Sequence, residues 1–216
     1  VLTMDARFTE VPDGAVLISG PRVAAVRPMR DPRVAQAIAA GAEVIDARGG
    51  LVLPGLINTH THLGMTLFRG MADDRDLQAF LDAVWPLERE FVAADTVRLG
   101  VGLGIAESLR AGVTTAADMY FHPAVAAAEA ERIGFRLLTG PTLADGIGVE
   151  FADFDASFAA AREWLAEREP GLGLRMSLCP HSTYLLDDRQ LQRIAALGAE
   201  FDALVQVHAA ENGPEI

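Results

Sequence analysis

From Pro54 onward, short apolar runs alternate with longer stretches that carry apolar residues at helical spacing, and this alternation is the strongest constraint on the fold. We expect strands to end near residues 62, 118, 139, 179 and 208, and helices over residues 76–91, 95–111, 124–133, 155–169 and 187–197. Repeated βα units build a parallel sheet, and five in a row favour a TIM-type (β/α)8 barrel. Because a whole barrel takes about 250 residues, residues 54–216 are expected to be an incomplete barrel that holds strands 1 to 5.

The residues before Pro54 have a different pattern, with four short runs typical of strands. Residues 15–18 and 22–26 flank Ser19-Gly20-Pro21, which is typical of a hairpin turn. Residues 43–46 and 51–53 are two further candidate strands. So little sheet is not stable alone, and we expect it to pair with strands outside this stretch.

Two histidines, His60 and His62, stand where the first strand after Pro54 ends. Strand side chains alternate between faces, so both imidazoles point the same way. Two imidazoles side by side form half of a divalent metal site, and the alternative is a pair of core histidines satisfied by polar neighbours. His208, again at the end of a short apolar run, favours the metal site.

Glu211 follows His208 by three residues. Catalytic zinc takes three protein ligands and keeps one position for water. Glu211 is near enough in sequence to His208 to lie over that water and accept its proton, and the alternative is a solvated loop acid. Three nitrogen ligands with a nearby carboxylate are typical of a metal centre that activates water.

The composition narrows the class of partner. The net charge is −12 and all 18 basic residues are arginine, which argues against nucleic acid or an anionic membrane as a partner. One cysteine, Cys179, excludes an internal disulfide and suits a reducing compartment. Because no apolar stretch is long enough to span a membrane, we expect a cytoplasmic protein. The chain begins at Val1 and stops just beyond His208, so an N-terminal fragment is expected.

Several motifs along the chain resemble one known family in order and approximate spacing. They are Pro54-Gly55-Leu56-Ile57-Asn58-Thr59-His60-Thr61-His62, Trp85-Pro86-Leu87-Glu88, Asp118-Met119-Tyr120-Phe121, Pro180-His181-Ser182-Thr183-Tyr184 and His208-Ala209-Ala210-Glu211. The chain is similar to the amidohydrolase superfamily, and within it to methylthioadenosine/S-adenosylhomocysteine deaminases and related aminohydrolases and chlorohydrolases.

The resemblance implies a metal-dependent hydrolase barrel in which His60, His62 and His208 bind one divalent metal, zinc first and iron as the alternative. It implies that Glu211 shuttles protons, and that residues 1–53 form part of a small β-sandwich completed by the C-terminus.

The same resemblance assigns roles around the metal. Glu88 would hydrogen-bond a ribose-like diol, His181 would contact the heterocycle and take part in catalysis, and Trp85 would line the pocket. The alternatives are a helix surface acid for Glu88, a loop histidine for His181 and a core position for Trp85. We expect Asp118 and His122 to be structural.

The chain departs from the family pattern in two places. A histidine after strand six and a metal-binding aspartate after strand eight have no counterpart, so we expect this stretch alone to bind metal weakly and to be inactive. The loop after strand three, residues 139–148, contains none of the arginines that would hold a substrate carboxylate. A neutral purine is therefore favoured over adenosylhomocysteine.

The expected function is metal-dependent hydrolytic deamination of an amino-substituted heterocycle, purine- or nucleoside-like, in which metal-activated hydroxide attacks the amine-bearing ring carbon. The alternatives are hydrolytic dehalogenation of a triazine-like ring and a truncated, non-catalytic fragment. The expected partners are a small heterocyclic substrate and further copies of the same protein, with neither nucleic acid nor membrane among them.

Overall fold

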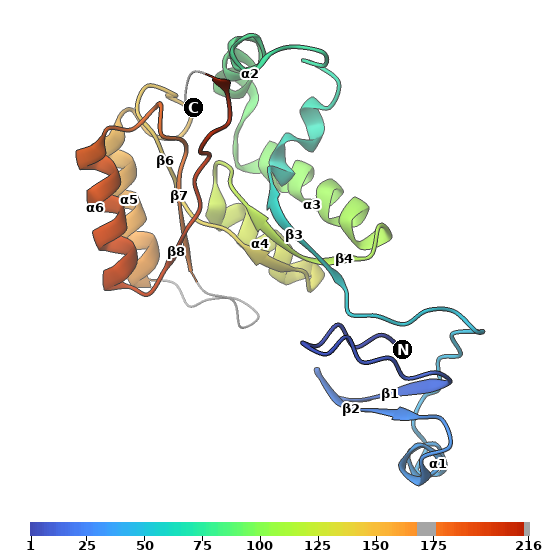
Figure 1. Ribbon diagram of the computed structural model, residues 1–216. Helices are drawn as coiled ribbons and strands as arrows, with labels where there is room; N and C mark the ends of the chain where they lie inside the picture. The colour runs from blue at the N-terminus through green and yellow to red at the C-terminus, as the bar shows by residue number, and fades with distance from the viewer. Residues whose placement is uncertain (168–175, 214–216) are drawn as a thin grey trace. The chain divides into compact units, whose positions relative to one another are not determined.

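The computed structural model describes residues 1–167 and 176–213. The chain divides into two compact units, Val1–Gly55 and Leu56–Ile216. Figure 1 shows the first unit in blue, with the helices and parallel strands of the second unit in the remaining colours.

The first unit contains the predicted hairpin. Strands β1 (Gly14–Ser19) and β2 (Arg22–Pro28) pair antiparallel, and Gly20 takes a φ of 54° in the turn between them. A positive φ is easily adopted by glycine, which has no Cβ. The helix that follows, α1 (Pro32–Ala39), was not predicted. Its N-cap, Asp31, accepts a hydrogen bond from the backbone N–H of Arg33.

The strands predicted over residues 43–46 and 51–53 are wrong, because both segments are irregular. Val44 and Ile45 are 59% and 87% exposed, so no strand of this unit pairs with them or covers them. Val52 makes one ladder-like contact, in which its carbonyl accepts the backbone N–H of Leu2 at 2.8 Å. An apolar alternating run does not form a strand without a partner on its edge.

The second unit contains two parallel sheets. One has the order β3 (Leu56–Thr61), β4 (Val113–Asp118), β5 (Arg136–Leu138), and the other β6 (Thr142–Leu143), β7 (Ser177–Pro180), β8 (Leu204–Val205). The helices are η1 (Leu63–Phe68), α2 (Leu77–Phe91), α3 (Ala94–Arg110), α4 (Pro123–Ile133), α5 (Phe154–Glu167) and α6 (Asp188–Glu200). Parallel strands joined through helices confirm the predicted α/β fold with barrel-type βα units.

Two local predictions differ from the structure, and two others lie partly outside the described residues. The loop expected after strand three, over residues 139–148, contains β6, whose Thr142 and Leu143 pair with Cys179 and Pro180 of β7. Helix α3 begins after Ala93 rather than at Asp95, because the Thr96 hydroxyl accepts the Ala93 N–H at 2.8 Å. The predicted helix end at residues 168–169 and the predicted strand start at residues 174–175 lie outside the described residues.

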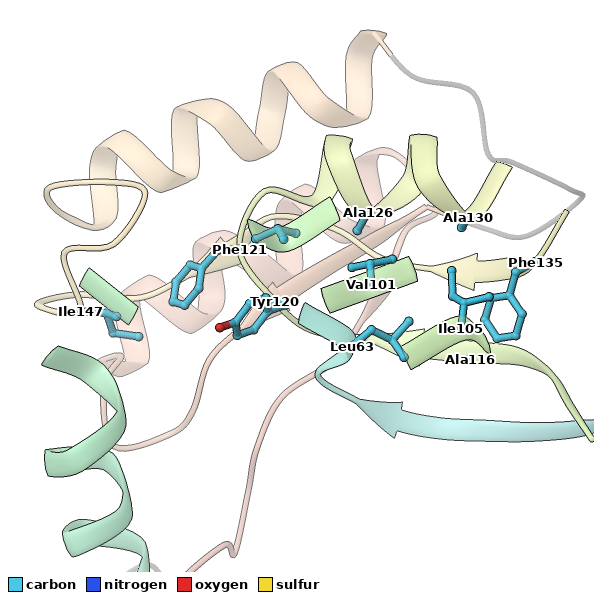
Figure 2. Packing of buried hydrophobic residues seen from close by; sticks show 11 residues of the cluster. Leu63, Val101, Ile105, Ala116, Tyr120, Phe121, Ala126, Ala130, Phe135 and Ile147 are labelled. Atoms are coloured by element: carbon cyan, nitrogen blue, oxygen red, sulfur yellow. The ribbon is translucent and has the colours of Figure 1, made fainter. Parts of the chain in front are cut away.

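Two hydrophobic clusters hold the second unit together. The first lies between the β3–β4–β5 sheet and helices α3 and α4, and Figure 2 shows Leu63, Val101 and Ile105 close together within it, with Phe135 beside Ile105. The second joins Leu143 and Leu178 to the inward faces of α5 and α6, which lie side by side in Figure 1. Cys179 in β7 is completely buried. Both clusters fix the strands, so the residues just after each strand have defined positions.

In the part of the chain that the structure describes, none of the helices combines the length and the apolar character needed to cross a membrane.

Candidate active site

Three histidines, two near the start of the second unit's sequence and one near its end, meet at the ends of its strands. His60 lies on β3, His62 directly follows that strand, and His208 lies beyond β8, where it forms a parallel bridge with Ser182. One nitrogen of each ring lies within 4.8 Å of the others. His60 Nε2 and His208 Nε2 are 3.2 Å apart. These two residues are 148 positions apart in the sequence, and the parallel arrangement of the strands brings them together.

Two of these rings are oriented by backbone carbonyls. His62 Nδ1 bonds the carbonyl oxygen of Met119, and His208 Nδ1 bonds that of His181 at 2.5 Å. A carbonyl oxygen only accepts, so Nδ1 must bear the proton in both rings and Nε2 must bear the lone pair. Fixing the outer nitrogen in this way is how proteins orient metal-binding histidines.

Burial favours the neutral, metal-binding form of His60 and His62. Burial lowers the pKa of His62 to about 4 and also lowers the pKa of His60. The neighbouring charge of His208 acts in the same direction on both. Neutral imidazoles whose lone pairs converge fit a divalent cation, and the three histidines can therefore hold a metal ion.

Glu211 lines the same pocket as the histidines and is exposed. Its Oε2 accepts a hydrogen bond of 3.0 Å from the Tyr184 hydroxyl, in the loop between β7 and α6. The carboxylate therefore has a held orientation beside the histidine cluster and access to solvent, and both properties suit a group that exchanges protons.

His181 directly follows β7, and its ring lies between the histidine cluster and α2. The ring centroid is 5.0 Å from that of His208 and 6.4 Å from that of Trp85, which meets it edge-on. Burial lowers the pKa of His181 to about 3, with His208 and His62 adding to the effect. His181 Nδ1 is buried with no hydrogen-bond partner among the described residues. A neutral, unpaired ring nitrogen in a pocket is available to a ligand.

Glu88 is a buried acid on α2, only 4% exposed. Its Oε1 accepts a 2.8 Å hydrogen bond from the hydroxyl of Tyr120, which is also buried. Burial raises the pKa of Glu88 to about 7, against the hydrogen bond from Tyr120 and the charge of Arg89, which lower it. The alternative of a helix surface acid is therefore wrong for Glu88.

One pocket contains all the predicted site residues except His60. It is lined on one side by apolar residues of α2 and on the other by residues that follow the strands. The lining residues are His62, Met65, Leu77, Phe80, Leu81, Val84, Trp85, Glu88, Met119, Tyr120, Phe121, Thr142, His181, His208 and Glu211. Apolar walls with a few convergent polar groups are typical of a small-molecule site.

Sequence reasoning missed the residues that orient the others, Tyr120, Tyr184 and the Met119 carbonyl. Tyr120 stands two residues after β4 and Tyr184 four residues after β7, both within motifs singled out by similarity alone. For Tyr120 the available signal was a polar aromatic residue just beyond a buried strand, because a buried tyrosine hydroxyl needs a partner.

Parallel βα units that bring three histidines together at strand ends define an α/β barrel protein with a candidate metal centre. The chain belongs to the amidohydrolase family, whose model matches residues 51–216. It is 38% identical over 185 residues to the 5-methylthioadenosine/S-adenosylhomocysteine deaminase of Halobacterium salinarum, a match that covers 82% of this chain and 41% of that protein.

Solved structures show the same fold. A crystal structure of an adenosine deaminase from Xanthomonas campestris with bound zinc is 30% identical, with a TM-score of 0.79, over 95% of this chain and 46% of that one. Atrazine chlorohydrolase from Arthrobacter aurescens, complexed with zinc, is 22% identical with a TM-score of 0.82, over 96% of this chain and 51% of that one, and shows the fold alone. The chain spans about half the length of the relatives it matches.

Proposed function

We propose that the protein is a metal-dependent hydrolytic deaminase of an amino-substituted heterocycle, purine- or nucleoside-like. The observation behind this proposal is the convergence of three histidine nitrogens within 4.8 Å, beside a pocket that Glu211, His181 and Glu88 also line. Similarity to proteins named as deaminases of adenine nucleosides supports the substrate class.

We assign the metal to His60, His62 and His208 and propose zinc, with iron as the alternative. The all-nitrogen donor set suits zinc, and a similar solved structure contains it. When bound, a divalent ion lowers the pKa of water enough to supply a nucleophile at neutral pH.

Glu211 is proposed to move the proton. Its carboxylate takes one proton from the attacking water and delivers it to the ring nitrogen. The hydroxyl then on the ring carbon gives its remaining proton, through the same carboxylate, to the exocyclic amine, which leaves as ammonia while a ring carbonyl remains. The Tyr184 hydroxyl, bonded to Oε2, holds the carboxylate in one orientation during this transfer.

His181 and Trp85 are proposed to hold the heterocycle. The His181 ring is neutral and buried, and it can accept or donate one hydrogen bond to a ring substituent. Trp85 meets it edge-on and offers an apolar face on which a flat ring can pack.

Glu88 is proposed to bind hydroxyl groups on the far side of the ring, as in a ribose diol. Carboxylate oxygens accept hydrogen bonds from paired hydroxyls, and those bonds are strong in a buried site. The neighbouring α2 side chains Leu77, Phe80, Leu81 and Val84 make the rest of this wall apolar. An uncharged nucleoside fits this wall better than one bearing a carboxylate.

We further propose that residues 1–53 belong to a β-sandwich domain and that residues 54–216 form strands 1 to 5 of the barrel. A cytoplasmic location is proposed from the single buried cysteine.

The test is ammonia release by the zinc-loaded, full-length protein with adenosine, methylthioadenosine, adenosylhomocysteine, guanine and aminotriazines. We expect turnover of a neutral adenine nucleoside, its loss in His208→Ala, and its retention in His122→Asn, since His122 lies outside the histidine cluster. Chloride release from a chlorotriazine with no ammonia from any of these compounds would replace the proposal with a dehalogenase.

A further inference from the structure

The three residues at the end of β4 each form a hydrogen bond with a different part of the site. Asp118 bonds the turn after His62, Met119 bonds the His62 ring, and Tyr120 bonds Glu88. Met119 and Tyr120 also line the pocket. Their shared position suggests one shared role.

Asp118 holds the backbone next to the first histidine pair. Its side chain is completely buried, and its Oδ1 accepts the backbone N–H of Leu63 at 2.6 Å. On the same stretch, the Met119 N–H donates to the Thr61 carbonyl at 3.0 Å, and the Met119 carbonyl accepts from His62 Nδ1. His62 is therefore held at its ring and at the residues on both sides of it.

The turn after His62 has no room for a side chain at its closest contacts. A Cβ on Gly64 would lie 2.3 Å from the Tyr120 ring, and a Cβ on Gly100 of α3 would lie 2.3 Å from the Gly64 carbonyl oxygen. Contacts this short do not occur for real Cβ atoms. The two glycines let the turn fit between α3 and Tyr120, and Figure 2 shows Leu63 beside Val101 of α3 at this point.

Tyr120 links this turn to the substrate side of the pocket. Its ring covers Gly64, while its hydroxyl donates to Glu88 Oε1 at 2.8 Å. The backbone carbonyl of Tyr120 in turn accepts from the Thr142 hydroxyl at 3.1 Å. Glu88 is thus oriented through the same segment that orients His62.

We propose that residues 118–120 are the positioning element of the site, in which Asp118 sets the His62 ligand for the metal and Tyr120 sets Glu88 for the substrate hydroxyls. The Tyr120 part rests on the proposed function, whereas the Asp118 part concerns metal binding and is independent of which reaction the protein performs. Neither residue touches the reacting atoms, so both act through the groups they hold.

The Asp118 part is tested by zinc affinity, measured by chelator competition on the full-length protein. Asp118→Val removes the acceptor for the Leu63 N–H, and we expect affinity to fall by about 10- to 100-fold, as for other groups that orient ligands. Asp118→Asn keeps an acceptor oxygen and should restore affinity to within about threefold of the wild type. Ile194→Val, in the second hydrophobic cluster, is the control for a general loss of stability.

Wild-type zinc affinity in Asp118→Val, or an equal loss in Ile194→Val, would overturn the role of Asp118. If Asp118→Val does not fold, Gly100→Ala serves as the second variant, because it presses on the Gly64 backbone and leaves the Asp118 side chain unchanged. Weakened zinc binding in Gly100→Ala supports the proposal, and unchanged binding overturns it.

The Tyr120 part is tested with Tyr120→Phe, which removes one hydroxyl. We expect kcat/KM to fall by about 10-fold for adenosine but much less for 2′,3′-dideoxyadenosine, with zinc affinity unchanged. In the double variant with Glu88→Gln the loss should not add, because both changes break one interaction. Equal losses for the two nucleosides would overturn this part, as would a wild-type protein that does not distinguish them, and zinc binding by the Asp118 variants would still be interpretable.

Discussion

The histidine site has two walls, one on the β4 side and one on the β8 side. Both walls orient a histidine ring in the same way, but the first is buried and the second is exposed. On the β4 side, Asp118, Tyr120 and Glu88 are buried. The Tyr120 hydroxyl donates a hydrogen bond to Glu88, and Asp118 accepts one from the Leu63 backbone N–H. On the β8 side, Val205 and Val207 are 45% and 42% exposed, and Glu211 is exposed. Yet His62 and His208 are each oriented by a backbone carbonyl through Nδ1.

The difference separates two requirements of hydrolytic catalysis. A metal ligand needs a fixed direction, and burial with satisfied hydrogen bonds supplies it on the β4 side. A proton-transfer group needs to exchange protons with water, and the exposed Glu211 on the β8 side can do so. The buried wall holds carboxyls whose pKa burial raises to about 7, as for both Glu88 and Asp118. The variants with the largest expected effect remove the metal-binding histidine from one wall at a time.

We expect His62→Ala and His208→Ala each to weaken zinc binding by more than about 100-fold, beyond the loss typical of residues that only orient ligands. Dialysis of the zinc-loaded protein followed by metal analysis measures the retained metal. His122→Asn keeps a residue that tolerates the left-handed backbone found there and should retain zinc. If one of the two ligand variants retained zinc normally, its wall would not contribute to the metal site.

The next effect concerns stability against pH and belongs to the buried wall alone. The pKa of Glu88 rises from 4.5 to about 7 on folding because of burial. Its favourable contribution is therefore complete below pH 4.5 and is lost as the pH rises through 7, up to about 3 kcal/mol.

Glu88→Gln cannot ionise, so it should reduce the fall in unfolding free energy between pH 5 and pH 8.5 by about that amount. Urea unfolding of the metal-free protein at the two pH values measures the free energy of unfolding. Glu90→Gln, an exposed acid on the same helix, is the matched control. An unchanged pH profile in Glu88→Gln would mean that Glu88 is not desolvated in the folded protein.

A smaller effect is expected on the exposed wall. Tyr184→Phe removes the hydroxyl that donates to Glu211, and we expect kcat to fall by about 2- to 10-fold, since a hydrogen bond near solvent has a modest net value. Zinc affinity should not change. A loss of zinc in this variant would show that the β8 wall, like the β4 wall, orients the metal through its side chains.

The smallest effect lies away from both walls. Arg162 and Glu200 form an ion pair between α5 and α6 at 2.9 Å and 3.1 Å, with both side chains about half exposed. Arg162→Gln should leave the unfolding midpoint, zinc affinity and turnover unchanged within error. A measurable loss of zinc would extend the positioning network beyond the two walls.

Local patterns predicted those parts of the molecule that local interactions determine. The helix expected over residues 76–91 is found close to those bounds, and Asp76 caps it. The strand over Val113–Asp118 was predicted at its observed bounds. The runs at residues 43–46 and 51–53 failed because a strand exists only when another edge pairs with it, and that cannot be read from the run itself.

The candidate site divides in the same way. His60 and His62 were found from their spacing on one strand, and His208 from its place after another. The Tyr120–Glu88 bond joins residues 32 positions apart on different elements, and only the packing of α2 against the β4 end brings them together. Asp118 was expected to be structural, and its contact with Leu63 could not be inferred from sequence because it depends on the register of β3 and β4.

Cys179 is a built-in probe of local opening in the second sheet. It lies in β7, between β6 and β8, with no exposed surface, and burial raises the pKa of its thiol to about 12. Thiol reagents need an accessible thiolate, so modification proceeds only through openings that expose β7, and its rate reports how often they occur. The rate of Cys179 modification therefore measures how often the central strand of the second sheet opens, and no cysteine has to be introduced for the measurement.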